Sequence, residues 1–205
     1  MRRLFGVEYR TTDYVIIDLE ATCWQERTPR ERKETIEIGA VRMDGETLRA
    51  YDEFTTLVRP VEYPELSDFC RRLTHIRQRD VDAAPHFTVA LAELIEWLGP
   101  DPVLFCSWGT FDRTQLRIDC RRHGVPFPEV LSQHVDLKKA FAEWRQHKRV
   151  GLKKALQLLD MPFVGTPHRG LDDARNVARI AQIMFPELLR KGYFEFTAVQ
   201  SSGAR

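Results

Sequence analysis

Apolar residues near the start of the chain follow strand-like patterns. Residues 15–20 form an apolar, β-branched run, and residues 35–43 and 47–58 alternate in the manner of strands. Between the last two segments stands Asp44-Gly45, a dipeptide typical of tight hairpin turns. We therefore expect three strands that begin a meandering sheet.

Helical spacing of apolar residues dominates the remainder of the chain. Helices are predicted over residues 64–73, 87–98, 111–123, 137–144, 152–159 and 171–185. Between them, residues 103–106 read as a buried fourth strand and residues 134–137 as a short fifth. A strand that enters after a helix should lie parallel to the first strand. The pattern predicts an α/β domain with a mixed sheet flanked by helices.

Length and composition favour one globular domain. The chain has 205 residues, of which 43% are hydrophobic and 30% charged. We expect a single domain over residues 1–205, with its core at about 12–190, a loose N-terminus and a loose C-terminal tail. No apolar run approaches the roughly 20 residues of a membrane span, and no signal peptide is apparent, so a cytoplasmic protein without membrane contact is expected.

Cysteines and charges add two constraints. The four cysteines match neither a zinc site nor a disulfide framework and are expected to be reduced thiols; they are Cys23, Cys70, Cys106 and Cys120. Residues 113–154 hold 11 Lys or Arg against 4 Asp or Glu, whereas the rest of the chain holds 20 against 26. The basic stretch could guide a polyanion, or it could be an uneven set of solvated helix faces.

Two carboxylates lie at the end of the most apolar strand. Because strand side chains alternate, Asp18 and Glu20 point to the same side, about 6.5 Å apart along the strand. Two carboxylates on one face repel each other strongly unless a cation lies between them. The alternative is that both lie just past the strand and are solvated.

A third carboxylate is selected by helical periodicity. On a wheel of about 100° per residue, Asp173 falls within the apolar half of the helix over residues 171–185, and Asp172 falls within the polar half. A favourable helix dipole explains an acid at Asp172 but not the apolar neighbours of Asp173. We expect Asp173 to face inward.

Two further residues have suggestive positions. His168 lies in a Pro- and Gly-containing loop before the helix of Asp173, from which it can reach over the same site. Asp112 follows the fourth strand, at the first turn of a helix. Functional groups collect at the carboxyl ends of parallel strands, which would bring Asp18, Glu20 and Asp112 together. A surface histidine and a dipole-stabilised helix acid are the alternatives.

The order of these residues resembles a known family. D-x-E on the first strand, a later Asp, and H-x4-D opening a late helix resemble the DEDDh 3′-to-5′ exonucleases, whose ribonuclease H-like fold has a central mixed five-stranded sheet. The sequence that flanks these residues is similar to that of the ERI-type branch, which trims RNA 3′ ends, and to that of KapD-like bacterial proteins. The stretches that carry the resemblance are residues 17–23 (IDLEATC), 37–41 (EIGAV), 73–76 (LTHI), 107–109 (SWG) and 168–176 (HRGLDDARN).

The resemblance implies a two-metal hydrolysis. Asp18, Glu20 and Asp173 would hold one divalent ion, Asp18 would bridge to a second, and Asp112 would support the second. Oxygen ligands suit Mg²⁺, with Mn²⁺ as a substitute. His168 would accept a proton from the attacking water. A 5′-nucleotide would leave the 3′ end of single-stranded RNA or DNA, with RNA favoured and no obligate protein partner evident.

The terminal nucleotide also needs a binding surface. Residues expected to provide it are Leu19, Thr22, Trp24, Leu73, His75 and Trp108. Aromatic rings stack on bases without reading sequence, although either tryptophan could instead pack in the core. His75 departs from the ERI-type pattern, which usually has Gly or another small or polar residue there. Arg169 follows His168 where the DEDDy branch would require a tyrosine.

Other functions remain open at the level of sequence. A DNA 3′-end-trimming exonuclease and an oligoribonuclease-like enzyme for very short substrates use the same residues, and a phosphatase is a further reading. A nucleic-acid-binding module without catalysis predicts that at least one of the five site residues is missing, and none is.

Overall fold

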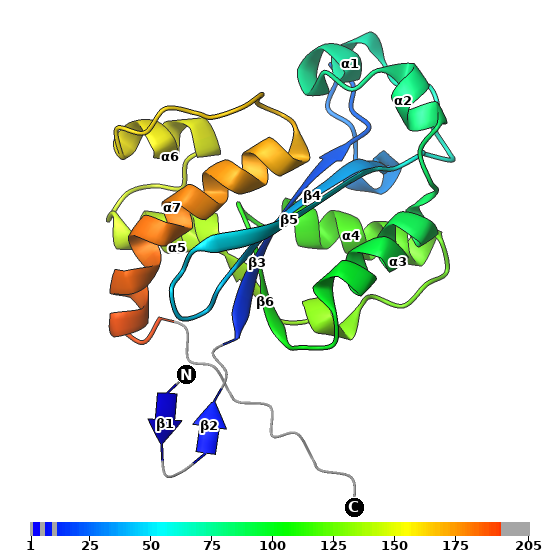
Figure 1. Ribbon diagram of the computed structural model, residues 1–205. Coiled ribbons are helices and arrows are strands. Elements are labelled where there is room, and N and C mark those ends of the chain that lie inside the picture. Colours follow the sequence, from blue (N-terminus) through cyan, green and yellow to red (C-terminus); the bar gives the residue numbers. More distant parts are fainter. Residues whose placement is uncertain (1, 5–6, 10–11, 194–205) are drawn as a thin grey trace, which may run out of the picture.

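The computed structural model describes residues 2–4, 7–9 and 12–193. Strands β1 (Arg2–Leu4) and β2 (Val7–Tyr9) form a small antiparallel pair apart from the main sheet (Figure 1). The expectation of a loose N-terminus stays a prediction. The predicted loose tail at residues 200–205 lies outside the described residues.

The main sheet has five strands in the order β5-β4-β3-β6-β7. Strand β3 (Asp13–Ala21) pairs antiparallel with β4 (Thr35–Met43), and β4 pairs antiparallel with β5 (Ala50–Leu57). On its other side β3 pairs parallel with β6 (Val103–Ser107), which pairs parallel with β7 (His134–Asp136). The predicted mixed sheet and its parallel fourth strand are confirmed.

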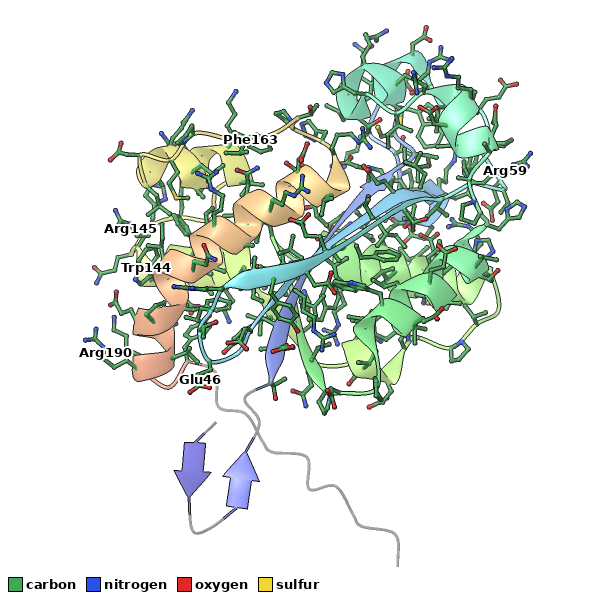
Figure 2. The ribbon with its side chains drawn as sticks, viewed as in Figure 1. Glu46, Arg59, Trp144, Arg145, Phe163 and Arg190 are labelled. Carbon is green, nitrogen blue, oxygen red and sulfur yellow. The ribbon has the colours of Figure 1, made fainter. Side chains whose placement is uncertain are left out.

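Helices cover both faces of this sheet (Figures 1 and 2). They are α1 (Asp68–Thr74), α2 (Gln78–Asp82), α3 (Phe87–Leu98), α4 (Phe111–Arg122), α5 (Leu137–Trp144), α6 (Leu152–Leu158) and α7 (Gly170–Arg190), with 3-10 turns η1 (Arg30–Arg32) and η2 (Glu129–Leu131). Within the described part of the chain, no helix is both long and apolar enough to cross a membrane.

Strand β3 is buried on both faces, which explains its continuous apolar run. Tyr14 and Ile16 pack in one apolar cluster with residues of α5, α6 and α7. Val15 and Ile17 pack in a second cluster with residues of α3 and α4. Alternation along the strand places Asp18 on the side of Tyr14 and Ile16, where α7 begins. The fold thus directs the strand's carboxylates toward α7.

The hairpin between β4 and β5 differs from the predicted tight turn. Asp44 Oδ1 accepts hydrogen bonds from the main-chain N of Glu46 and Thr47, at 3.2 and 2.6 Å. Leu48 adopts a left-handed conformation with φ of 59°. This side-chain-stabilised loop lengthens the connection, so β5 begins at Ala50 and not at residue 47.

Two helix boundaries also differ from the prediction. Helix α1 begins at Asp68 and not at residue 64, because Ser67 Oγ accepts a hydrogen bond from Cys70 N and caps the helix there. Helix α7 continues past Pro186 to Arg190, because burial of Leu188 compensates for the one hydrogen bond that proline cannot donate. The five-residue α2 was not predicted.

Candidate active site

Two glycines allow α7 to begin directly on the sheet. A Cβ atom on Gly39 would lie 2.0 Å from Leu171 N, and one on Gly170 would lie 2.9 Å from Asp18 O. No side chain fits between these backbones. The first turn of α7 therefore lies over the strand segment that carries Asp18.

Helix α7 directs one of its two adjacent acids into the site. Asp173 is 9% exposed, and its Oδ2 accepts a hydrogen bond from His168 N at 3.1 Å. Asp172 lies on the outer side and accepts from Thr166 N at 2.8 Å and Arg175 Nη1 at 3.0 Å. The helical register predicted from the sequence is confirmed.

Asp112 reaches the same edge of the sheet from α4. Its side chain is buried, and Oδ1 accepts a hydrogen bond from Leu19 N at 3.0 Å. Leu19 stands between Asp18 and Glu20, so this single bond joins α4 to the strand that carries both acids. The predicted convergence of Asp18, Glu20 and Asp112 is present in the structure.

Sequence reasoning missed an ion pair between a buried carboxylate and a partly exposed arginine beside these acids. Glu37 is 1% exposed on β4, opposite Glu20, and accepts hydrogen bonds from Arg169 Nη2 at 2.8 Å and Gly170 N at 2.9 Å. This pair fixes the chain where α7 begins. An acid between the apolar Ile36 and Ile38 was a signal in the sequence, but its partner stands 132 positions away.

The four acids perturb one another strongly. Burial, followed by the charge of Asp112, raises the pKa of Asp18 well above the ordinary value, and burial with the charge of Asp173 does the same for Glu20. Burial raises the pKa of Asp112 to about 6 and that of Asp173 to about 7. Buried carboxylates so close together are unfavourable in their charged form unless a cation offsets their repulsion.

The donor set fits a hard divalent cation. Carboxylate oxygens of four acids suit Mg²⁺ or Mn²⁺. One potential ligand atom each from Glu20, His168 and Asp173 lies within 4.8 Å of the others. These residues come from β3, the loop before α7, and α7 itself. The close backbone approaches at Gly39 and Gly170 bring these elements together.

His168 lies over this cluster on an exposed loop. Its φ is 61°, a left-handed conformation, and partial burial followed by the nearby charge of His75 lowers the pKa of its imidazole. The ring is therefore neutral at pH 7 and able to accept a proton. His75 ends α1 with φ of 59°, a backbone conformation that favours glycine.

The residues predicted to bind a nucleotide divide into two groups. Trp24, Leu73 and His75 are half-buried or exposed, and Trp24 packs edge-on against Tyr63 at 5.3 Å. Trp108 Nε1 donates to Val150 O at 3.1 Å, which corresponds to the core-packing alternative.

The remaining two side chains have little access to a ligand. Leu19 packs in the apolar cluster on the far face of β3, and Thr22 is buried, with its hydroxyl accepting from Glu34 N at 3.0 Å. Their role in substrate binding stays a prediction, and their burial weighs against it.

Comparisons with known proteins agree with this arrangement. The sequence model of the family described as "Exonuclease" matches residues 15–181. ERI1 exoribonuclease 2 of Danio rerio is 34% identical over 194 residues, covering 84% of this chain and 35% of the relative. The human 3′-5′ exoribonuclease 1 is 34% identical over 185 residues, covering 85% of this chain and 53% of the relative. The chain thus spans about a third to a half of the length of these curated relatives.

A solved structure supports the same class. The nuclease domain of 3′hExo, described as a DEDDh family member bound to rAMP, superposes with a TM-score of 0.81 at 32% identity, covering 91% of this chain and 96% of that one. The fold and the arrangement of the site are those of the ribonuclease H-like class. The chain belongs to the exonuclease family, and its resemblance to the DEDDh, ERI-type branch is confirmed. This family depends on divalent metal.

Proposed function

We propose that this protein is a metal-dependent 3′-to-5′ exonuclease that hydrolyses single-stranded nucleic acid, with RNA favoured, and releases 5′-nucleotides. The observation that carries the proposal is the convergence of four carboxylates and a neutral histidine at one edge of the sheet. The names of the relatives support the direction of cleavage and the preference for RNA.

The four acids would hold two Mg²⁺ ions, for which Mn²⁺ would substitute. Asp18, Glu20 and Asp173 would bind one ion, and Asp18 and Asp112 the other. When bound, the ions activate the attacking water and stabilise the departing oxyanion.

The chain itself contributes a proton acceptor and a rigid frame. His168, neutral at pH 7, accepts a proton on its ring nitrogen from the attacking water. The Leu19–Asp112 hydrogen bond and the Glu37–Arg169 pair hold the acids in place before substrate arrives. Trp24, Leu73 and His75 would enclose the terminal base, on the side of the acids formed by α1 and the loop after β3.

Two other substrates remain alternatives within the same chemistry. A DNA 3′-end-trimming enzyme or an oligoribonuclease-like enzyme would use the same acids. A binding module without catalysis is disfavoured, because all five predicted site residues are present and come together.

Matched oligonucleotides decide among these substrates. RNA and DNA of one sequence, in lengths from 2 to about 20 nucleotides, are compared by kcat/KM with Mg²⁺ and with Mn²⁺. The proposal expects faster cleavage of RNA. A tenfold or larger preference for DNA would refute the RNA assignment, and a sharp maximum at two or three nucleotides would favour the oligoribonuclease-like alternative.

We further propose that the whole chain is one exonuclease domain acting in the cytoplasm. The family match from residue 15 to 181 supports the single domain. The four cysteines are free, as expected in a reducing compartment.

A further inference from the structure

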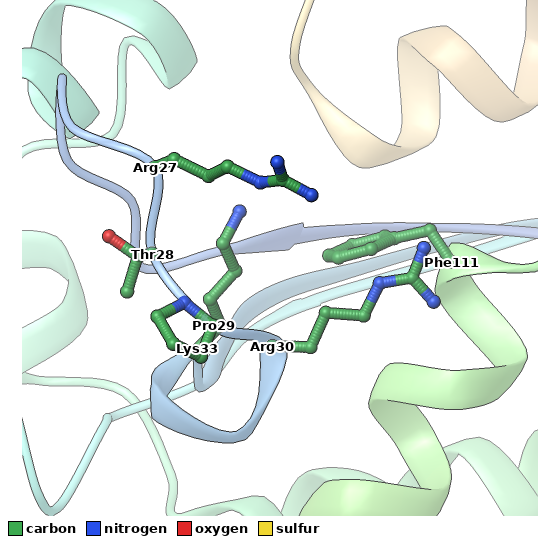
Figure 3. A pocket seen from close by; sticks show the side chains of 6 residues that line it. All are labelled: Arg27, Thr28, Pro29, Arg30, Lys33 and Phe111. Atoms are coloured by element: carbon green, nitrogen blue, oxygen red, sulfur yellow. The ribbon is translucent and has the colours of Figure 1, made fainter.

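A cationic pocket lies next to the acidic site. It has a volume of about 580 Å³ and is lined by Arg27, Thr28, Pro29, Arg30, Lys33 and Phe111. Figure 3 shows the charged ends of Arg27, Arg30 and Lys33 directed into one space beside the Phe111 ring. Phe111 immediately precedes Asp112, so the pocket adjoins the edge of the sheet where the acids meet.

The loop that carries these cations is held by its main chain. Arg122, whose side chain is 8% exposed on α4, donates through Nη1 to Lys33 O at 3.0 Å and through Nη2 to Glu31 O. Gln115 Nε2 donates to Lys33 O at 2.8 Å. These contacts fix the backbone without using the side chains of Arg27, Arg30 or Lys33. Arg122 itself, which belongs to the basic stretch over residues 113–154, serves this structural purpose.

The three cationic groups have no anionic partner within residues 12–193. Arg30 and Lys33 lie over the Phe111 ring, at 5.8 and 5.6 Å from its centroid, and neither they nor Arg27 forms an ion pair with another described residue. The acids of the same loop, Glu26 and Glu31, are exposed and make no ion pair with them. Three positive charges held together without an anion create a site for a polyanion.

We propose that this pocket binds the backbone phosphates of the substrate strand on the 5′ side of the nucleotide being removed. The inference rests on the proposed exonuclease function. An enzyme that cleaves at the 3′ end has one nucleotide beyond the scissile phosphate, and the predicted walls for that nucleotide do not line this pocket. What binds here therefore belongs to the rest of the strand. Because its cations contact phosphates, the pocket serves RNA and DNA alike.

The test is the double variant Arg27→Gln/Arg30→Gln. Affinity for a 5′-fluorescein-labelled 12-nucleotide RNA is measured in EDTA across a range of salt concentrations. The slope of log K against log salt should become shallower by about 1.4, since each neutralised single-strand phosphate contributes about 0.7. With Mg²⁺, kcat/KM should fall about tenfold or more for the 12-mer and stay within about twofold for a dinucleotide, which has no upstream phosphate.

A matched control removes two cations elsewhere. Arg49 lies in the connection between β4 and β5, at the opposite end of β4 from Glu37. Arg190 ends α7 (Figure 2), at the opposite end of that helix from Asp173. Arg49→Gln/Arg190→Gln should leave the salt slope and both kcat/KM values unchanged. An unchanged slope in the pocket variant, or an equal change in the control, would overturn the inference. If the wild type binds RNA through Arg27 and Arg30 yet cuts nothing, phosphate binding by the pocket stands, while the proposed function fails and with it the placement of these phosphates relative to a removed nucleotide.

Discussion

The closest backbone approach in the site gives a sharp prediction for Gly39→Ala. The added Cβ would lie 2.0 Å from Leu171 N and 2.1 Å from Gly170 C, whereas ordinary contact needs roughly 3.4 Å. Both neighbours are main-chain atoms, so the start of α7 must move by more than about 1 Å. Asp173 lies in the first turn of α7 and moves with it.

The expected losses affect activity and stability together. Misplacement of a catalytic group by about 1 Å costs on the order of 10²-fold in rate, so kcat should fall by about that factor or more. Overpacking of this kind costs about 1–3 kcal/mol of unfolding free energy. Thermal unfolding and kcat on a labelled RNA measure the two effects, and circular dichroism shows whether the variant is folded.

Two further glycine variants grade the effect. Gly170→Ala brings its Cβ to 2.9 Å from Asp18 O, a milder clash, and should cost less than Gly39→Ala. Gly151 has open space around its position and an extended backbone, with φ of −67° and ψ of 161°, so Gly151→Ala should keep wild-type kcat. A Gly39→Ala protein with wild-type kcat and melting temperature would show that α7 does not depend on this contact.

Three other outcomes follow from the site. Asp173→Asn should abolish cleavage. Asp172→Asn should keep most of kcat, because Asp172 makes only outward contacts, to Thr166 and Arg175. An equal loss of kcat in both variants would contradict the separate roles of these acids. Because we assign His168 to proton transfer, His168→Ala should lower kcat by about 10²–10⁴. Its Mn²⁺ affinity, measured by calorimetry, should stay nearly unchanged. A loss of Mn²⁺ affinity as large as that in Asp173→Asn would instead identify His168 as a metal ligand. Because burial raises the pKa of Asp173 to about 7, its stabilising contribution is complete below the unfolded value near 4 and is lost as pH rises through 7. In EDTA, the free energy of unfolding should therefore fall by on the order of a few kcal/mol between pH 5 and pH 8, and the melting temperature should fall with it. The fall should be smaller in Asp173→Asn. A melting temperature that does not change over this range would contradict the raised pKa of Asp173.

The sequence predicted the acids that interrupt a clear apolar pattern. Asp173 could be oriented because α7 is strongly amphipathic over several turns, and Asp18 and Glu20 because β3 alternates. Asp112 could be placed because it lies in the first turn of the helix that follows a buried strand. For Asp18, Glu20 and Asp173 local periodicity determines the direction of the side chain, whereas Asp112 is placed by the rule that functional groups collect at the carboxyl ends of parallel strands.

The features that the sequence did not reveal depend on tertiary contact. The Glu37–Arg169 pair joins distant residues, and the close approach of Gly39 to Gly170 exists only once α7 lies on the sheet. Helix α2 has five residues and no repeating apolar pattern that could identify it. Thr22 is buried where its hydroxyl accepts a hydrogen bond from Glu34 N, twelve positions along the chain, and no local sequence pattern predicts this contact.

The most direct test of the metal-bound acid cluster is the cleavage ladder of a 5′-labelled single-stranded RNA. With Mg²⁺, the wild type should shorten the labelled strand one nucleotide at a time from its 3′ end, and both EDTA and Asp173→Asn should stop this shortening. Full activity in EDTA, or immediate release of the 5′ label as a mononucleotide, would contradict the role we assign to Asp18, Glu20, Asp112 and Asp173.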